Sequence, residues 1–246
     1  QRSELDPQWC VIGMIGGTGA GKSSLVNALG GGEVVAAGVL RPTTNEACAV
    51  LPRGREPQEL LGWLGIGRRV EAPQGFPGDT VVVDLPDIDS VEACHAEITD
   101  RLASRVDALV VVVNPQKYAD ARLHDEWLAR LRSSHASVTV VLTHIDTVSM
   151  PERDVIAQDL RRLLNERGAA QAEVFAVSST TGEGMRTLIK HLTREAELVA
   201  RQASRARAAL REASRLLGES LELTGTVRGL ETDGLAAELA GTAADL

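Results

Sequence analysis

The fold of this chain is decided by one stretch near its start, Gly16-Gly17-Thr18-Gly19-Ala20-Gly21-Lys22-Ser23. The stretch matches the pattern G-x-x-x-x-G-K-[ST] at every position. Its glycines let successive backbone N–H groups curl around a phosphate, and its lysine offers a point charge to the β- and γ-phosphates of a nucleotide. The serine hydroxyl can ligate Mg²⁺, and the helix that follows presents its positive N-terminus to the anion. We therefore predict a loop that binds a nucleoside triphosphate with Mg²⁺, with Ser24 as a further contact.

Strands and helices alternate around this loop for about 190 residues. Continuous apolar runs, typical of strands covered on both faces, lie at residues 10–15, 47–51, 80–85, 108–114, 137–143 and 173–177. Helical spacing of apolar residues lies at 23–29, 91–106 and 151–168. This order predicts an α/β fold with a doubly wound, mostly parallel sheet, in which the ligand site lies at the carboxyl ends of the strands. A plain glycine-rich turn at 16–23 is disfavoured, because the stretch lies between a predicted strand and a predicted helix.

The composition narrows the class of protein further. Hydrophobic residues make up 43% of the 246 residues, which indicates a globular chain, and the net charge of −8 disfavours a general nucleic-acid surface. Cys10, Cys48 and Cys94 lack metal-ligand spacing, so we expect reduced, buried thiols, as in the cytosol. No run approaches the length of a membrane span. We expect a soluble, cytoplasmic chain, with membrane association of the full-length protein left open.

Two further positions are candidates for the phosphate and metal side of the site. Thr44 lies where a loop can close over the γ-phosphate through Mg²⁺, and we favour it over Thr43 because it lies just ahead of a strand. The alternative is an ordinary turn. Asp84 ends a strong strand, the place of the carboxylate that supports Mg²⁺ in P-loop enzymes. The predicted metal-binding groups are therefore Ser23, Thr44 and Asp84.

The base side is predicted from two segments that follow strands. Asp146 ends Thr143-His144-Ile145-Asp146, and its carboxylate can accept both the N1–H and the exocyclic amine of guanine, a donor pair that adenine lacks. The run Ser178-Ser179-Thr180 can place a backbone N–H on the guanine O6, although such a serine run is also typical of a plain loop. We expect Thr143, His144, Asp146, Ser178 and Ser179 to bind the base.

Taken in order, these motifs resemble the Era-like and dynamin-like branch of the translation-factor-related P-loop GTPases, including its bacterial dynamin-related members. The resemblance covers roughly residues 9–195 and rests on Gly21–Leu29 (GKSSLVNAL), Arg41–Thr44 (RPTT), Asp84–Pro86 (DLP) and Thr143–Asp146 (THID). It implies a nucleotide-controlled switch that binds GTP and GDP and hydrolyses GTP with Mg²⁺. It also implies catalytic roles for Lys22, Thr18 and Thr44.

The sequence departs from the family pattern at several positions. Asp87 replaces the glycine whose N–H meets the γ-phosphate, and Ile88 stands where Ras-like enzymes hold the glutamine that orients water. Gly19 replaces an asparagine of the potassium-dependent relatives, which leaves Thr18 as the polar P-loop candidate. Substitutions in the base motifs, His144 and Thr180 in place of lysines, weaken base contacts. We therefore expect slow hydrolysis and modest affinity.

The chain divides into a predicted P-loop GTPase domain at residues 1–190 and the start of a helical region at 191–246. Residues 52–78 read as an insertion, in which Trp63 and Leu64 are expected to pack on the domain; contact with a partner or a lipid is the alternative. A heptad seam marks a long helix to about residue 223 and comprises Leu192, Ala196, Val199, Ala203, Ala206, Leu210, Ala213 and Leu217. Residues 233–246 also look helical, and we expect the helical region to continue in the full protein.

Two other functions remain open at this point. A dynamin-type, membrane-associated mechanochemical GTPase would act through a homodimer of its heads, and the heptad seam favours it. A module that senses GTP or GDP with little hydrolysis is favoured by Asp87, Ile88 and Gly19. A ribosome-assembly role like that of Era would need an RNA-binding appendage, and we expect no direct binding of nucleic acid.

Overall fold

The computed structural model of the chain describes residues 6, 8–35, 46–74, 76, 79–87, 93–116, 137–166 and 168–224, without the side chains of 93–96 and 218–224. Its strands are β1 (Cys10–Ile15), β2 (Cys48–Leu51), β3 (Arg68–Glu71), β4 (Thr80–Asp84), β5 (Ala108–Val113), β6 (Ser137–Leu142) and β7 (Glu173–Ala176). Its helices are α1 (Lys22–Gly30), α2 (Gln58–Leu64), α3 (Ala93–Ala103), the 3₁₀ turn η1 (Ile145–Thr147), α5 (Met150–Glu166) and α6 (Met185–Thr224).

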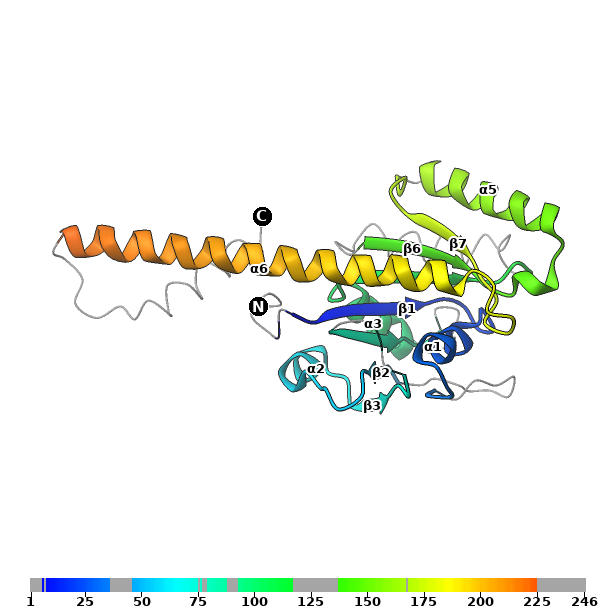
Figure 1. Ribbon diagram of the computed structural model, residues 1–246, viewed down its shortest axis with the longest axis horizontal. Coiled ribbons are helices and arrows are strands. Elements are labelled where there is room, and N and C mark those ends of the chain that lie inside the picture. Colours follow the sequence, from blue (N-terminus) through cyan, green and yellow to red (C-terminus); the bar gives the residue numbers. More distant parts are fainter. Residues whose placement is uncertain are drawn as a thin grey trace.

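The described strands form one seven-stranded sheet in the order β3-β2-β4-β1-β5-β6-β7 (Figure 1). Strands β4, β1, β5, β6 and β7 run parallel to one another, whereas β2 is antiparallel to β4 and parallel to β3. The prediction of a doubly wound, mostly parallel sheet is confirmed. Because the parallel strands share a direction, their carboxyl ends meet at one edge of the sheet.

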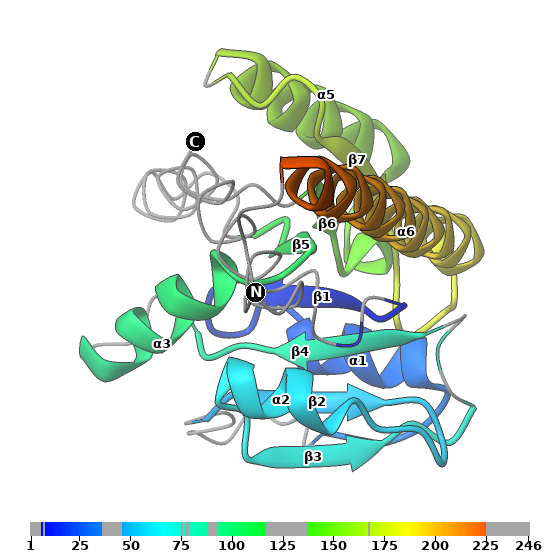
Figure 2. The ribbon, with the colours of Figure 1, turned by 90° about the vertical axis from the view of Figure 1, so that its left-hand side faces the viewer.

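Helices cover both faces of this sheet, as the apolar strand sequences predict. Alternate residues of each strand point to opposite faces, so Val11 joins one core cluster and its neighbour Ile12 joins the other. The cluster around Val11 packs against α2, α3 and α5, and the cluster around Ile12 packs against α1 and the first turns of α6. Figure 2 shows these two layers of helices on either side of the strands. Cys10 and Cys48 are buried and form no disulfide, as expected, and the side chain of Cys94 lies outside the described residues.

The predicted insertion at 52–78 adds α2 and the edge strand β3 to the domain. Leu60, Leu61 and Leu64 are fully buried, and Trp63 packs against the same core cluster. The guanidinium of Arg105 lies 4.8 Å from the Trp63 ring centroid and donates to the Trp63 carbonyl oxygen at 3.0 Å. The expectation that Trp63 and Leu64 pack on the domain is confirmed. Strand β3 was not predicted.

Helix α6 is one continuous helix of 40 residues, which confirms the predicted helix to about residue 223. Its first turns are buried through Met185, Leu188, Leu192 and Ala196. Its later part extends well beyond the sheet, where Leu216 is 51% and Leu217 is 41% exposed (Figure 1). Among the described helices, none is both long and apolar enough to cross a bilayer. The domain division at residue 190 stays a prediction, and residues 233–246 lie outside the described part of the chain.

Candidate nucleotide-binding site

The candidate site lies at the carboxyl edge of the parallel strands, where the predicted side chains converge from separate parts of the sequence. The loop at 16–23 follows β1, Asp84 ends β4, Thr143 follows β6, and Ser178 follows β7. Sheets of this kind bind ligands at this edge. The fold therefore gathers the sequence motifs at one end of the molecule.

The loop between β1 and α1 takes a shape that requires its glycines. Gly19 and Gly21 have φ angles of 72° and 92°, in the left-handed region that other residues rarely adopt. A Cβ on Gly16 would lie 2.5 Å from the carbonyl oxygen of Val112, and a Cβ on Gly21 would lie 2.7 Å from Cε1 of His144. The loop backbone is thus packed directly against β5 and against the segment after β6.

Lys22, the first residue of α1, is 5% exposed and holds two partners. Its Nζ donates to the carbonyl oxygen of Gly16 at 2.9 Å, which folds the side chain back across the loop. The same ammonium group forms an ion pair with the carboxylate of Asp87, three residues beyond the end of β4. A carboxylate of the chain itself therefore contacts the cation that a P-loop directs at phosphate.

Ser23 and Asp84 lie beside one another beneath the loop. The Ser23 hydroxyl donates to Oδ2 of Asp84 at 3.3 Å, and Asp84 is only 1% exposed. Burial raises the pKa of Asp84 to about 6, and the positive charge of Lys22 opposes that rise. Oδ1 of Asp84 is buried without a hydrogen-bond partner among the described residues. A buried carboxylate oxygen next to a serine hydroxyl fits the oxygen ligands that Mg²⁺ prefers.

Mg²⁺ takes one or two protein ligands and completes its shell with substrate phosphates and waters. In the described part of the chain there is no group of three or more His, Cys, Asp or Glu side chains that could hold a metal ion. The oxygen atoms of Ser23 and Asp84 fit such a shared site. Thr44, the third predicted ligand, lies outside the described residues.

Thr143 ties the base segment to the phosphate loop. Its hydroxyl lies 2.6 Å from the carbonyl oxygen of Ala20 and 3.1 Å from that of Val113, and it donates to these carbonyls. Nδ1 of His144 lies 2.9 Å from the same hydroxyl, which fits a ring that carries its proton on Nδ1. His144 has a φ of 53° and lies against Gly21. The imidazole thus faces the loop backbone.

Asp146 and Ser178 face each other across the base side of the site. Asp146 is exposed, and a hydrogen bond from the Ser178 hydroxyl is the main cause that lowers the pKa of its carboxyl below the usual value. Ser178 itself is fully buried, and its Oγ accepts from the backbone N–H of Thr181 at 3.1 Å. An exposed carboxylate that stays ionised and is held by a buried serine has the properties required to accept two N–H groups of guanine.

Other predicted residues line the same edge with less definite contacts. Thr18 and Ser179 are half-buried, and Ser24 is exposed on the first turn of α1.

Two asparagines that no sequence motif indicated hold the loops of the site by hydrogen bonds to the backbone. Asn114, after β5, donates to the carbonyl oxygen of Gly19 at 3.1 Å. Asn27 on α1 donates to the Val35 carbonyl oxygen at 2.8 Å and accepts from the N–H groups of residues 34 and 35 at 2.9 Å each.

The order of the strands, the glycine-dependent loop and the buried lysine define the class of P-loop nucleotide-binding proteins. Residues 11–144, more than half of the chain, match the protein family described as the 50S ribosome-binding GTPase. The chain belongs to this family and is therefore a GTP-binding P-loop GTPase domain. Membership of a GTPase family implies that it hydrolyses GTP.

Two relatives show how far the likeness in sequence extends. The probable GTP-binding protein EngB of Chelativorans sp. (strain BNC1) is 27% identical over 191 residues, which cover 72% of this chain and 76% of that protein. The selenocysteine-specific elongation factor of Escherichia coli (strain K12) is 32% identical over 119 residues, which cover 48% of this chain. This chain spans only 19% of the elongation factor's length.

Solved structures share the fold at low sequence identity. Era of Aquifex aeolicus, bound to GDP·AlF₄⁻, superposes with a TM-score of 0.58 at 15% identity and covers 76% of this chain and 56% of its own. A chain from an oligomerised bacterial dynamin pair superposes with a TM-score of 0.60 at 16% identity and covers 90% of this chain and 52% of its own. Era and dynamin are therefore structural neighbours of this chain.

Proposed function

We propose that this domain is a Mg²⁺-dependent nucleotide switch that binds GTP and GDP and hydrolyses GTP slowly. The observation that carries the guanine assignment is the pair of Asp146 and Ser178. Asp146 is exposed near the phosphate loop, and the Ser178 hydroxyl lowers the pKa of its carboxyl below the usual value. Guanine offers two adjacent N–H donors to such a carboxylate, whereas adenine offers no such pair. Thr143 and the backbone around Ser179 complete the base side of the proposal.

On the phosphate side, Lys22 and the N–H groups of residues 16–23 would hold the β- and γ-phosphates, and Ser23, Asp84 and Thr44 would support Mg²⁺. The ion would neutralise charge on the phosphate oxygens when bound. The protein's own contribution is positioning and electrostatics, from a buried ammonium and from backbone dipoles fixed by the glycines. Thr18 is the polar side chain of the loop that we assign to the attacking water.

The expectation of slow hydrolysis is supported by what surrounds the phosphate loop. Gly19 brings no side chain to the reaction, and a Cβ placed there would meet no atom within 4 Å. In this proposal the Lys22–Asp87 ion pair would set a carboxylate beside the γ-phosphate, where its negative charge opposes GTP more than GDP, which lacks that phosphate. This pair is the specific observation that favours the second candidate, a module that distinguishes GDP from GTP with little hydrolysis.

A dynamin-type protein that acts through head dimerisation and membrane association is the third candidate. The observation in its favour is α6, which carries the predicted heptad seam and extends well beyond the sheet after a buried start (Figure 1). A helix with such a seam is stabilised by a partner helix. A GTP-dependent change from monomer to dimer, measured by light scattering, would select this candidate over the other two.

The guanine assignment is tested by calorimetric titration of Mg·GDP, Mg·GTPγS and Mg·ATPγS into the wild-type chain and Asp146→Asn. We expect both guanine nucleotides to bind the wild type, and Asp146→Asn to lose at least tenfold in affinity for them, since a charge-assisted contact is worth about 1.5–3 kcal/mol. Asp154→Asn, which neutralises an exposed carboxylate on α5, is the matched control and keeps wild-type affinity. Equal affinity of the wild type for the adenine nucleotide would overturn the assignment.

A further inference from the structure

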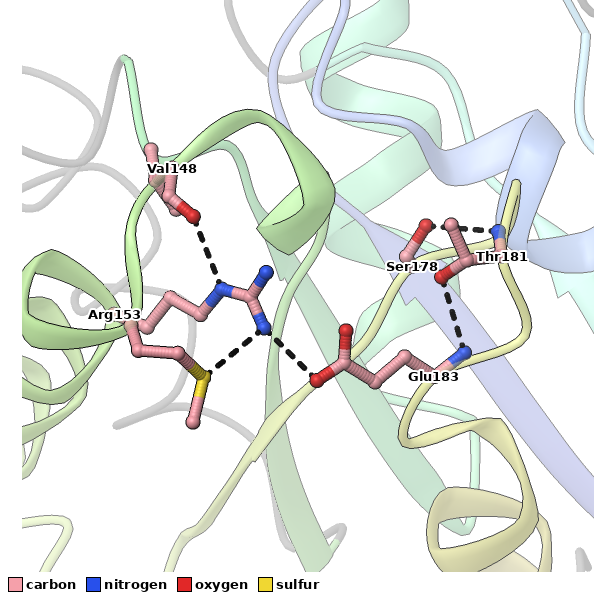
Figure 3. A network of polar contacts seen from close by, with 6 residues as sticks. Val148, Arg153, Ser178, Thr181 and Glu183 are labelled. Atoms are coloured by element: carbon pink, nitrogen blue, oxygen red, sulfur yellow. Dashed lines mark hydrogen bonds and ion pairs between the residues drawn. The ribbon is translucent and has the colours of Figure 1, made fainter.

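One guanidinium group lies between the two segments that we assign to the base. Arg153, in the first turn of α5, donates through Nε to the carbonyl oxygen of Val148 at 3.1 Å. Its Nη1 donates to Oε1 of Glu183 at 2.8 Å and contacts Sδ of Met150 at 3.5 Å. Figure 3 shows that the side chain spans from the segment after Asp146 to the loop that follows Ser178. A single side chain therefore joins both halves of the base side.

The acidic side chain that bonds the residue before α5 is Glu152. Its Oε2 accepts from the backbone N–H of Ser149 at 2.8 Å and from the Ser149 hydroxyl at 2.6 Å. A cation in the first turn of a helix is opposed by the helix dipole. The side chain of Arg153 is nevertheless only 16% exposed, because it is directed to Val148 and Glu183. The contacts of Arg153 therefore connect the segment at Val148 with the loop at Glu183.

Backbone hydrogen bonds connect Glu183, the partner of Arg153, with Ser178. The carbonyl oxygen of Glu183 accepts from the N–H of Ser178 at 3.0 Å, and its N–H donates to Oγ1 of Thr181 at 3.3 Å. The N–H of Thr181 in turn donates to Oγ of Ser178 at 3.1 Å (Figure 3). The loop is therefore a closed set of hydrogen bonds, and its outer carboxylate is held by Arg153.

These contacts form a continuous series from Val148, two residues after Asp146, through Arg153 and Glu183 to Ser178, whose hydroxyl lowers the pKa of the Asp146 carboxyl. We propose that Arg153 and Glu183 are positioning residues for guanine recognition, which hold the carboxylate of Asp146 and the loop of Ser178 at a fixed separation. The inference rests on the proposed function, in which these two segments bind guanine. Neither residue contacts the nucleotide in this proposal.

The test compares GDP with inosine diphosphate, which keeps the phosphates and the ribose but lacks the exocyclic amine that Asp146 would accept. Dissociation constants of both, with Mg²⁺, are measured calorimetrically for the wild-type chain, Arg153→Met, Glu183→Gln and the double variant. Methionine keeps an unbranched apolar stem and removes the charge. We expect each single variant to bind GDP on the order of fivefold to tenfold more weakly, and the double variant to be no weaker than the single ones.

The ratio of the two affinities separates positioning from general stability. We expect the preference for GDP over inosine diphosphate to fall severalfold in Arg153→Met, because loss of register weakens the contact with the exocyclic amine most. Arg162→Met is the control: its partners, Asp159 and Glu166, lie on the same helix α5, so the ratio should stay at the wild-type value.

Three results would overturn the inference while leaving the proposed function intact. They are wild-type GDP affinity in Arg153→Met, an equal loss for both nucleotides, and additive losses in the double variant. A different result identifies failure of the proposed function itself: a wild-type chain that shows no preference for GDP over inosine diphosphate, or a preference that Asp146→Asn leaves unchanged. That result would remove the basis of the inference as well.

Discussion

Lys22 and Asp87, 65 residues apart in the sequence, form an ion pair at the centre of the candidate site. The lysine is nearly buried, and 22% of the Asp87 side chain is exposed. In the family that this chain resembles, the position of Asp87 is a glycine. The carboxylate therefore contacts the cation that a P-loop directs at phosphate, and in the proposed function nucleotide and side chain would compete for Lys22.

We expect Asp87→Asn to raise the affinity for Mg·GTPγS on the order of tenfold and to raise that for Mg·GDP less. Removing the negative charge frees the ammonium group of Lys22 and removes repulsion that the γ-phosphate experiences most strongly. Calorimetric titration of both nucleotides measures the two changes. Asp79→Asn, which breaks an ion pair with Arg55 at the opposite end of β4, should change neither. Unchanged or weaker GTPγS binding would contradict competition between the carboxylate and the phosphate.

We expect the buried carboxyl of Asp84 to make the nucleotide-free protein less stable as pH rises from about 4 to 6. Its pKa rises from 3.8 in the unfolded chain to about 6 in the fold, so the folded state binds the proton more tightly. The stabilisation is complete below the unfolded pKa and is lost as pH rises to the folded value, by about 3 kcal/mol in all.

Other carboxyl groups also titrate in this window, so the measurement is the difference between the wild type and Asp84→Asn. The free energy of unfolding is determined by urea titration at pH 4, 5, 6 and 7 with a chelator present. We expect the variant to gain relative to the wild type as pH rises. A difference that stays constant across this range would show that Asp84 has an ordinary pKa.

Gly21→Ala should impair both folding and nucleotide binding. The φ of Gly21 is 92°, and an added Cβ would lie 2.7 Å from Cε1 of His144. We expect a loss of about 1–3 kcal/mol in the free energy of unfolding, because a non-glycine residue in this region is strained, together with weaker GDP binding. Gly62→Ala in α2 is the control, since a Cβ there meets nothing within 4 Å. The control should be neutral or stabilising by up to about 1 kcal/mol. Equal effects of the two substitutions would refute the requirement at Gly21.

Asn27→Ala should release the segment that precedes the predicted switch loop. The side chain of Asn27 holds residues 34 and 35 by three hydrogen bonds. We expect amide hydrogen exchange at Val34 and Val35 to accelerate on the order of tenfold while the strands keep their protection. Asn165→Ala, at an exposed position on α5, should leave this pattern unchanged. If Val34 and Val35 exchange at the wild-type rate in Asn27→Ala, the side chain does not hold the segment.

Elements with strong local patterns could be predicted from the sequence. The buried strands are continuous runs such as Ala108–Val113, and the phosphate loop between β1 and α1 is fixed by its glycines and lysine. Strand β3 was missed because its sequence, RRVE, is mostly exposed and carries no apolar run. An edge strand is defined by its pairing with a neighbour, here β2, and no local pattern in the sequence of β3 indicates that pairing.

The residues of the candidate site could be predicted from the sequence, but most of the contacts between them could not. The motifs placed Lys22, Asp84 and Asp146 at one edge of a sheet, and Asp87 was identified as a departure from the family pattern. Its pairing with Lys22 depends on the three-dimensional path of the chain after β4. Asn27 and Asn114 were missed for the same reason, since an asparagine that bonds a distant backbone carbonyl has no signature in the sequence. The role of Thr44 stays a prediction.

Helix α6 begins at Met185, directly after the loop that contains Ser178 and Glu183, and runs without a break to Thr224. At 1.5 Å per residue its length is about 60 Å. A tilt of roughly 5° at its first turn would therefore displace its last turn by about 5 Å, more than the diameter of a water molecule. A helix of this length would therefore act as a lever arm, converting a small adjustment of the loop that contains Ser178 and Glu183 into a larger displacement at Thr224.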